Sequence, residues 1–367
     1  QLFSGKQKDA FRSDELHEAL SLCLSCKACK SECPANVDMA KMKAEFMNGW
    51  HKERGATLSE SFFGNPEKFY PLASAFSSVT NFMNRQPAVK SLLEKTIGID
   101  SRRNLPEFSN QPFEKWFKKH ESDFHRPGAK QVLLLVDIFT NYHDPDIAKS
   151  ACRVLRKLGY SVIMPGIYPT GRPQLSKGFL DEVKTICELN IKRLVPFAEQ
   201  EIPIIGLEPS EILTIRDEYL DLCSEDDLGN AELIADKTFL FEEFLAEELA
   251  ISDLGKPGNS RNVYIHGHCH TKALIGNGPL VDSFKKLGFN PVELQTGCCG
   301  MAGSFGYSKD NYDVSMKIGG QVLFPALNEL PDDSIICSPG FSCRHQIADG
   351  QELKSYHPAE IVDRFMV

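Results

Sequence analysis

Two adjacent cysteines, Cys298 and Cys299, lie between glycines in the stretch Gly297–Ser304. The single peptide bond that joins adjacent cysteines holds their side chains in poor geometry for a disulfide with each other. The flanking glycines, Gly297 and Gly300, add no side-chain bulk and permit positive φ, so the backbone can fold tightly and direct both sulfurs at one object. A metal cluster is such an object. The alternative is a pair of small buried hydrophobic residues, because free cysteine is among the residue types most often buried.

A second group of cysteines lies near the start of the chain with the spacing C-x2-C-x2-C-x3-C-P: Cys23, Cys26, Cys29 and Cys33. Bacterial ferredoxins use this spacing, in which the first three cysteines bind one 4Fe-4S cluster and the fourth, before proline, binds another. Zinc is the alternative metal, but structural zinc sites usually combine two close pairs of ligands that lie far apart in the sequence. The spacing therefore predicts a 4Fe-4S cluster at these four cysteines.

The sequence contains one run of this kind, whereas a two-cluster ferredoxin has two. It also opens on Gln1 instead of an initiator methionine. Both features lead us to expect a processed or truncated chain whose second run lies upstream of Gln1. Either Cys33 or an upstream thiolate would then complete the cluster that Cys23, Cys26 and Cys29 begin.

The composition restricts the class of protein. The 367 residues are 42% hydrophobic and 25% charged, as in ordinary globular proteins of two or three domains. The net charge of -9 argues against nucleic acid and against an anionic membrane surface as partners. No apolar run approaches the roughly 20 residues of a transmembrane helix, and no signal peptide is recognisable. Cysteines at metal-ligand spacing then favour the reducing cytoplasm, with a peripheral position at the inner membrane face as a further option.

Helical patterns surround the N-terminal cysteines. Apolar residues recur at helical spacing in Asp14–Leu20 and in Val37–Phe46, so helices should hold the cysteine loop on both sides. The sequence 59–121 is also helical in pattern, and its aromatic residues either fill a core or form a docking face for a partner domain or membrane. We expect a helical 4Fe-4S domain at 1–58 and a helical connector at 59–127. The candidate docking residues are Phe62, Phe63, Phe69, Tyr70, Phe76 and Phe82.

From Gln131 onward, short apolar strands alternate with amphipathic helices, as in α/β domains with mainly parallel strands. Two helical patterns end in nearly the same sequence, 129 residues apart: Leu155–Tyr160 and Phe284–Phe289. We therefore expect two related α/β halves, at 128–255 and 256–367.

The same offset aligns the second group of cysteines with other residue types in the first half. The aligned pairs are Cys269 with Thr140, Cys298 with Pro169, Cys299 with Thr170 and, at an offset of 132, Cys343 with Glu211. All four positions are cysteine in the second half and another residue type in the first. We therefore interpret them as one site that is present in the second half and absent from the first. We predict that the four cysteines hold a second metal cluster, since clustered thiolates bind metals. A thiol-rich core is the alternative.

Residues near this site receive smaller roles. Cys337 lies in an apolar strand, so we interpret it as a core residue first and a reserve ligand second. His266, His268 and His270 flank Cys269 and suit zinc, but a hydrogen bond from His266 to cluster sulfur is the milder interpretation. Core positions in helices are predicted for three further cysteines: Cys152, Cys187 and Cys223.

Three phrases of the second half, His266–Cys269, Gly297–Gly303 and Ser342–Gln346, resemble the CCG cysteine-rich domain. That domain occurs in heterodisulfide reductase, in the iron-sulfur subunits of glycolate oxidase and anaerobic glycerol-3-phosphate dehydrogenase, and in lactate-utilisation proteins. The ferredoxin run followed by two such halves most resembles the C-terminal part of long bacterial fusion proteins whose N-terminal part is a flavin-linked oxidase of D-2-hydroxy acids. The chain departs from the pattern in its first half, which lacks the cysteines, and at Cys337 and Cys343, which are not a C-x2-C pair.

The resemblance implies an α/β fold of two duplicated Rossmann-like CCG halves about a pseudo-twofold axis, preceded by an all-helical ferredoxin-like domain. It implies that a flavin oxidises D-lactate or D-2-hydroxyglutarate and that electrons leave through two iron-sulfur clusters to an acceptor such as a quinone. The FAD would be bound by a separate oxidase domain or chain, on the N-terminal side of this one, because no G-x-G-x-x-G run follows a predicted strand here. Two alternatives stay open: a heterodisulfide-reductase-like thiol/disulfide enzyme and a zinc-binding module without redox chemistry.

Overall fold

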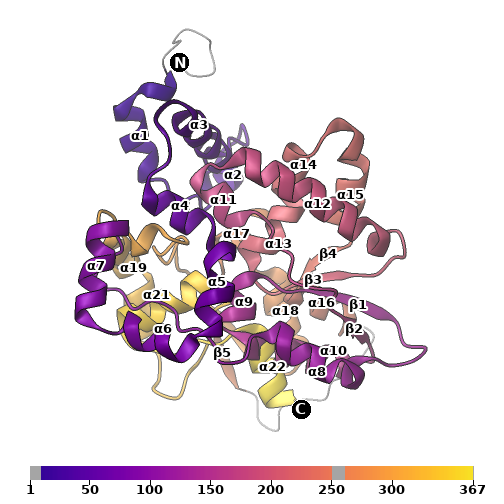
Figure 1. Ribbon diagram of the computed structural model, residues 1–367. Coiled ribbons are helices and arrows are strands. Elements are labelled where there is room, and N and C mark those ends of the chain that lie inside the picture. Colours follow the sequence, from indigo (N-terminus) through magenta and orange to yellow (C-terminus); the bar gives the residue numbers. More distant parts are fainter. Residues whose placement is uncertain (1–9, 250–260, 367) are drawn as a thin grey trace.

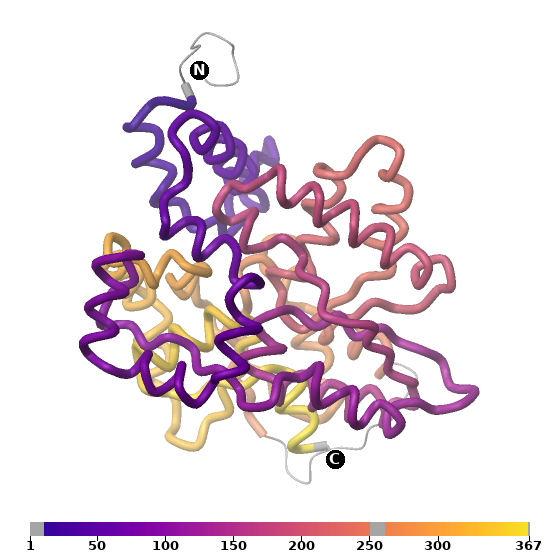
Figure 2. Tube along the Cα trace, in the orientation of Figure 1, coloured from indigo at the N-terminus to yellow at the C-terminus, as the bar shows by residue number. Residues whose placement is uncertain are grey.

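The structure is a computed structural model that describes residues 10–249 and 261–366. It is a mixed α/β protein in which helices dominate and the strands form two small parallel sheets. Figure 1 shows the N-terminal helices at one end of the molecule and the C-terminus near the other, and Figure 2 traces the same path. Within the described ranges, no helix combines the length and the apolar character that a bilayer span requires. The predicted boundary between residues 255 and 256 lies outside these ranges.

The N-terminal region is helical, and side-chain caps fix where its helices begin. After the 3-10 turn η2 (Ala10–Arg12), it contains α1 (Asp14–Ser21), α2 (Ala28–Glu32), α3 (Met39–Arg54) and α4 (Leu58–Gly64). The hydroxyl of Ser13 accepts a hydrogen bond from the N–H of Leu16 at 3.2 Å. The carboxylate of Asp38 accepts from the N–H groups of Ala40 and Lys41 at the start of α3. Helices are therefore present on both sides of the cysteine loop, and α3 is longer than its predicted pattern.

A helical connector follows, made of α5 (Pro66–Ala75), α6 (Ser77–Asn84), α7 (Pro87–Ile97) and α8 (Phe113–Phe124). Pro66 and Pro87 each take the first turn of a helix, where the fixed φ of proline is favourable and its missing N–H is not needed. These prolines explain why one long helical pattern is divided into short helices.

The aromatic residues of the connector differ in exposure. Tyr70 packs edge-on against Phe108 and His143, so it fills an internal space instead of facing a partner. Phe62 and Phe63 are half-buried as well. Three of the candidate docking residues are exposed: Phe69, Phe76 and Phe82. Only these three of the candidates remain available to a partner surface.

Four strands form the first sheet: β1 (Gln131–Leu135), β2 (Ser161–Ile163), β3 (Ile204–Gly206) and β4 (Thr238–Leu240). All neighbouring strands are parallel, and their order is β2-β1-β3-β4. The strands are short buried apolar runs, as expected where helices cover a parallel sheet. The connecting helices are α9 (Ile138–Tyr142), α10 (Pro145–Lys157), α11 (Arg172–Lys177), α12 (Leu180–Ala198), α13 (Pro209–Leu213), the π-helical turn η3 (Thr214–Glu218), α14 (Tyr219–Leu222), η4 (Glu225–Asp227), α15 (Leu228–Asp236) and α16 (Phe241–Glu248).

Three strands form the second sheet: β5 (Asn262–Ile265), β6 (Asn290–Glu293) and β7 (Ile335–Cys337). Its order is β6-β5-β7, again parallel throughout. The helices of this part are α17 (Cys269–Leu274), α18 (Gly278–Lys286), η5 (Phe305–Tyr307), α19 (Tyr312–Gln321), α20 (Leu323–Asn328), α21 (Phe341–Gln351) and α22 (Pro358–Met366).

The two sheets have the same order around their central strands. The order β2-β1-β3 in the first sheet matches β6-β5-β7 in the second. A parallel bridge between Cys337 and Tyr356 also lies beside β7, where β4 lies beside β3 in the first sheet. The two segments that repeat in the sequence end α10 and α18, and they lead into β2 and β6, which occupy matching places in the two sheets.

One hydrophobic core joins the two halves. It takes Val132 and Leu134 from β1 and Val263 and Ile265 from β5. The helical contacts across it are reciprocal: α10 packs against α22, and α18, which occupies the place of α10 in the second half, packs against α16. Each half thus buries apolar surface of the other. Such burial stabilises the folded state by about 25 cal/mol for each Å² of apolar surface removed from water.

Two buried carboxyl groups lie close to this core. Glu208 accepts a hydrogen bond from the N–H of Phe341 at 2.7 Å, and burial, with the nearby charge of Asp137, raises the pKa of Glu208 to about 7. On α16, burial raises the pKa of Glu242 to about 8, and the charges of Glu243 and Glu208 add to this effect. Since the ordinary pKa of glutamate is about 4.3, the folded protein keeps protons that the unfolded chain releases.

Glu242→Gln should reduce the pH dependence of stability. In the unmodified protein the free energy of unfolding falls as the pH rises from about 5 to 8, because the folded state binds protons that the unfolded state has lost. Glutamine cannot ionise, so the variant should lose on the order of 3 kcal/mol less over this window, as measured by denaturant unfolding. Glu247→Gln, at an exposed position of the same helix, is the matched control. Equal pH slopes for the two variants would contradict this account.

Candidate metal centres

Helices α1 and α3 flank the loop that carries the N-terminal cysteines: Cys23, Cys26, Cys29 and Cys33. The loop turns through positive φ three times, with 52° at Ser25, 62° at Lys27 and 53° at Asn36. Backbone N–H groups donate to its sulfurs, from Ser25 to Cys23 at 3.4 Å and from Met39 to Cys29 at 3.3 Å. Hydrogen bonds of this kind tune the reduction potential of iron-sulfur clusters.

The thiol of Cys26 lies among other thiols. Burial raises its pKa, and so do three nearby thiols, those of Cys269, Cys23 and Cys29. Cys33 has different surroundings, because the backbone N–H of Val37, followed by those of its neighbours, lowers the pKa of that thiol. The structure thus brings the first three cysteines of the run together and surrounds the fourth with N–H donors.

The four cysteines of the second group come from three elements of the second half. Cys269 opens α17, Cys298 and Cys299 lie in the loop after β6, and Cys343 is in the first turn of α21. Their thiols contact one another in series, Cys269 with Cys298, Cys298 with Cys299, and Cys299 with Cys343. The structure brings together all four of the cysteines that the repeat singled out.

Gly300 shows why a glycine follows the cysteine pair. Its φ is 91°, and a Cβ at this position would lie 2.3 Å from the carbonyl oxygen of Ser315 on α19. Only glycine permits both the backbone conformation and this close approach. Gly297 differs, because its φ is not in the left-handed region and a Cβ there would meet open space. The fold therefore requires the glycine after the cysteine pair and not the one before it.

His266 follows β5 directly and lies against two cysteines of the second group. Its Nδ1 is 2.6 Å from Oγ1 of Thr296, whereas its Nε2 is buried and has no hydrogen-bond partner among the described residues. Ligand atoms of His266, Cys299 and Cys343 all lie within 4.8 Å of one another, close enough to share a metal ion. Burial lowers the pKa of His266 to about 3, so its ring is neutral near pH 7.

The two cysteine groups meet where α2 packs against α17. Across this contact, His270 Nε2 donates to the carbonyl oxygen of Ser25 at 2.8 Å, and the thiol of Cys269 acts on the pKa of Cys26. Sequence reasoning missed this contact, because Ser25 and His270 are 245 residues apart and no pattern in either segment points to the other. The consequence is that the two groups of candidate metal ligands share one junction.

In the first half, three of the four aligned positions carry hydroxyl or carboxyl groups, and the fourth is Pro169. Thr140 donates to Asp137 at 2.6 Å, and Thr170 donates to Glu211. All four residues are buried, and burial raises the pKa of Glu211 to about 8. Iron-sulfur clusters are held by thiolates, so the first half lacks the ligands that the second half possesses.

The remaining cysteines lie in hydrophobic surroundings. Cys337, in β7, belongs to the core that both halves share. Cys152 and Cys187 are fully buried in helices. Cys223 packs against a second hydrophobic cluster, which includes Leu133 and Leu135 of β1. These places favour the core interpretation for all four residues.

Lys27 lies within the N-terminal cysteine run and forms ion pairs that attach this loop to the first α/β half. Its side chain is fully buried, and Nζ lies 3.1 Å from Asp38, 2.6 Å from Asp217 and 2.9 Å from Glu218. Burial alone would lower the pKa of Lys27, but Glu218 and Asp217 outweigh burial and raise it. The ammonium group is therefore charged and paired with carboxylates from two parts of the chain.

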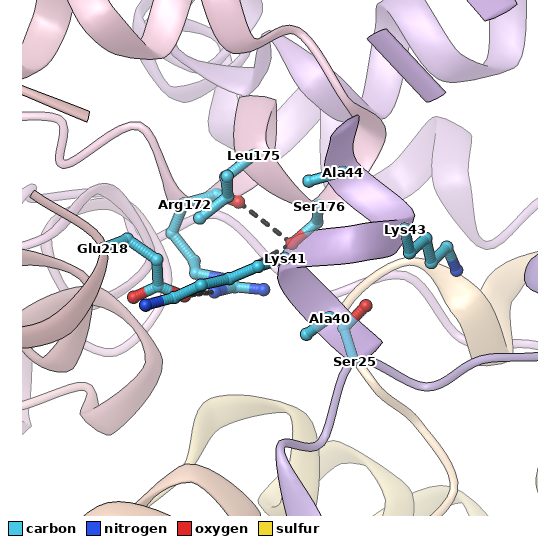
Figure 3. Close-up of a pocket in the computed structure, with 9 residues that line it drawn as sticks. All are labelled: Ser25, Ala40, Lys41, Lys43, Ala44, Arg172, Leu175, Ser176 and Glu218. Atoms are coloured by element: carbon cyan, nitrogen blue, oxygen red, sulfur yellow. Dashed lines mark hydrogen bonds and ion pairs between the residues drawn. The ribbon is translucent and has the colours of Figure 1, made fainter. Parts of the chain in front are cut away.

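Further positive charge lies around the loop. Figure 3 shows a small pocket beside Ser25, with Lys41 and Lys43 from α3 and Arg172 from α11. Lys43 donates to the carbonyl oxygen of Cys23 at 2.7 Å. A cluster bound by four thiolates carries net negative charge, which nearby cations stabilise. The thiols, the N–H donors and these cations together fit an iron-sulfur cluster.

Known proteins resemble the chain over most of its length. D-2-hydroxyglutarate dehydrogenase of Escherichia coli is 28% identical over 360 residues, which cover 95% of this chain and 34% of that protein. One subunit of the anaerobic glycerol-3-phosphate dehydrogenase of Escherichia coli is 26% identical, over 79% of this chain and 73% of that protein. Lactate utilization protein A of Exiguobacterium is 27% identical, over 63% of this chain and 96% of that protein. No family model matches the chain.

The chain spans about a third of the length of the D-2-hydroxyglutarate dehydrogenases that it matches. It is therefore similar both to one part of a long dehydrogenase and to most of a separate dehydrogenase subunit. These similarities support an oxidoreductase-related role for the chain.

Lys27→Met should weaken the attachment of the cysteine loop to the first α/β half. The change leaves Asp38 without a buried cation and removes one of the two cations that pair with Glu218, which keeps Arg172. Breaking a buried ion pair costs about 3 to 5 kcal/mol. Lys30→Met is the matched control, because its partner Asp217 keeps Lys27 and Lys41. Thermal unfolding and limited proteolysis of the N-terminal helices measure the effect. Similar losses in the two variants would show that the buried pair does not hold the loop.

Proposed function

We propose that this chain is the iron-sulfur electron-transfer region of a flavin-linked D-2-hydroxy acid dehydrogenase, of the D-lactate or D-2-hydroxyglutarate type. A flavin domain oxidises the substrate, and this chain passes the electrons to a downstream acceptor such as a quinone. The observation that carries the proposal is the junction of α2 and α17, where the two groups of thiols lie next to each other. Two neighbouring clusters form a path for electrons, which is what an electron-transfer region requires.

Each group of thiols supplies one cluster in this proposal. Cys23, Cys26 and Cys29 hold a 4Fe-4S cluster, with Cys33 or an upstream thiolate as the fourth ligand. The second iron-sulfur cluster is held by Cys269, Cys298, Cys299 and Cys343, with Cys337 as a reserve ligand. The contacts among the four thiols of the second group support this ligand set.

The polypeptide sets the conditions in which such clusters exchange electrons. Backbone N–H groups of Ser25 and Met39 donate to cluster sulfurs, and burial of Cys299 and Cys343 keeps water away from the second centre. Lys43 and Arg172 add positive charge beside the first centre. Hydrogen bonds, solvent exposure and net charge are the features by which a protein adjusts the potential of an iron-sulfur cluster.

The domain organisation proposed with this function follows the sequence analysis. A ferredoxin-like helical domain occupies 1–58 and a helical connector 59–127, followed by two Rossmann-like halves of CCG type at 128–255 and 256–367. The matching strand order of the two sheets supports the duplication. The first half is the degenerate copy, since Thr140, Thr170 and Glu211 stand where the second half has cysteines.

The FAD belongs to a partner in this proposal. The chain matches about a third of the long relatives, so the remaining two thirds of such a protein have room for a flavin-linked oxidase. Similarity to a separate subunit of glycerol-3-phosphate dehydrogenase indicates that the partner can also be another chain. We expect the protein to work in the cytoplasm or at the inner membrane face.

A zinc-binding module is the second candidate, because one observation favours it. His266, Cys299 and Cys343 form a mixed nitrogen and sulfur triad, which is a common ligand set for zinc. A zinc protein is colourless, whereas iron-sulfur clusters absorb visible light, so metal analysis after anaerobic purification separates the candidates. A heterodisulfide-reductase-like enzyme would instead turn over thiols or disulfides without any flavoprotein.

Cys299→Ala should lower the bound iron by about one cluster's worth, since thiolates hold these clusters. The electron paramagnetic resonance signal of the second centre should disappear while that of the N-terminal centre remains. If Cys299 were only a core residue, its replacement by alanine would lower the free energy of unfolding by on the order of 1 kcal/mol and leave the iron content unchanged.

Thr170→Ala is the control for Cys299→Ala, because it changes the aligned position of the first half. It removes the hydroxyl that donates to Glu211, so stability should fall slightly while iron content stays the same. Unchanged iron in Cys299→Ala would overturn the ligand assignment. A matching loss of iron in Thr170→Ala would mean that the site belongs to the other half.

Cys26→Ser should block the exit of electrons from the complete enzyme. Substrate should still reduce the flavin, because that step occurs on the partner, whereas reduction of a dye or quinone should cease. Cys223→Ser, at a cysteine that packs against a core, should leave dye reduction intact. Undiminished dye reduction in Cys26→Ser would remove the N-terminal cluster from the electron path.

A further inference from the structure

The imidazole of His266 has one nitrogen whose role the hydrogen bonds of the protein do not explain. His266 is 1% exposed, and Nε2 is a buried atom without a hydrogen-bond partner among the described residues. The same side chain has a ligand atom within 4.8 Å of the sulfurs of Cys299 and Cys343. A buried polar atom without a partner is costly, so a structure that keeps one requires an explanation.

Hydrogen bonding at the other nitrogen indicates where the ring proton lies. Nδ1 is 2.6 Å from Oγ1 of Thr296, and that hydroxyl donates to the carbonyl oxygen of Leu294 at 3.4 Å. With its hydrogen directed to Leu294, the hydroxyl oxygen accepts from Nδ1–H. Nε2, the buried nitrogen without a partner, then carries the lone pair of the ring. Metal-bound histidines generally use their second nitrogen in this way, to hold the ring in place.

We propose that His266 Nε2 is a direct ligand of the second metal centre, beside Cys299 and Cys343. This inference rests on the proposed function, because it assigns one more ligand to the same centre. The role that the sequence suggested, a hydrogen bond from His266 to cluster sulfur, needs an N–H on the side that faces the sulfurs. Because the hydroxyl of Thr296 donates to Leu294, we assign the N–H to Nδ1, and Nε2 then has no proton to donate.

The first half supports this role by comparison. At the position aligned with His266 it has Asp137, next to hydroxyls instead of thiols. Its carboxylate accepts hydrogen bonds from the N–H groups of Phe139 and Thr140 and from the hydroxyl of Thr140. The carboxylate oxygens of Asp137 therefore already have hydrogen-bond donors within the protein, unlike Nε2 of His266. The imidazole with a free nitrogen occurs in the half that has the cysteines.

A histidine ligand changes the electronic properties expected of the centre. Neutral imidazole contributes no negative charge, whereas a thiolate contributes one, so exchanging thiolate for imidazole raises the reduction potential, as the Rieske centres illustrate. A second centre with a higher potential than the cysteine-bound first centre would receive electrons from it across the junction of α2 and α17. The direction of electron flow between the clusters is thereby linked to one side chain.

The test is a measurement of nitrogen bound to the metal in the complete protein, purified anaerobically with its metals. Labelling with 15N-histidine should alter the hyperfine coupling of the reduced second centre, because a bound nitrogen couples strongly to the unpaired electron. His266→Ala should abolish that coupling. His266→Cys should keep the iron, lose the coupling and lower the midpoint potential, since it puts a negatively charged thiolate in the place of the neutral imidazole.

Two controls keep the ring and change its surroundings. Thr296→Val removes the hydroxyl next to Nδ1, and Asp137→Asn changes the aligned position of the first half, so both should retain the nitrogen coupling. A second-centre signal without 15N-sensitive coupling in the unmodified protein would overturn the inference and leave the iron-sulfur function standing. Zinc without iron would overturn the proposed function, and X-ray absorption at the zinc edge would then show or exclude an imidazole ligand that His266→Ala removes.

Discussion

The buried ion pairs of Lys27 are the interaction on which the relation between the two groups of cysteines depends. Lys27 lies within the N-terminal cysteine run and pairs with Asp38 of its own region and with Asp217 and Glu218 of the first α/β half. A buried cation of this kind tolerates little displacement, because its attraction to the carboxylates offsets a large desolvation cost only in good geometry. The cysteine loop is therefore held in one position on the α/β part. From that position, Ser25 reaches His270 and the two groups of thiols meet.

The chemistry of the second group depends on close approaches of backbone and side chains. The loop after β6 can pass close to Ser315 only because residue 300 is glycine. His268 packs against Gly340 in a similar way, since a Cβ at Gly340 would lie 2.3 Å from its ring. These small residues bring the loop, α17 and α21 close enough for their sulfurs to touch. The site is thus a product of three elements that share the edge of one sheet.

The sequence predicted the parts of the site that follow from spacing and repetition. The run from Cys23 to Cys33 and the aligned positions of the two halves singled out cysteines that the structure groups in space. The alternation of strands and helices likewise predicted parallel sheets, which the structure contains. The sequence could not predict contacts between distant segments, such as that of Ser25 with His270. It also could not assign the proton of His266, because that depends on Thr296, which a separate loop brings to the ring.

The reciprocal packing of α10 with α22 and of α18 with α16 has a consequence for how the chain can be divided. A cut between the halves would leave each fragment with an uncovered apolar face, since strands of both halves contribute to one core. Separately expressed fragments should therefore aggregate through their exposed apolar surfaces and become soluble only when they are produced together. The first half therefore contributes to the structure of the second independently of the residue types at its own aligned positions, because its strands and helices complete the shared core.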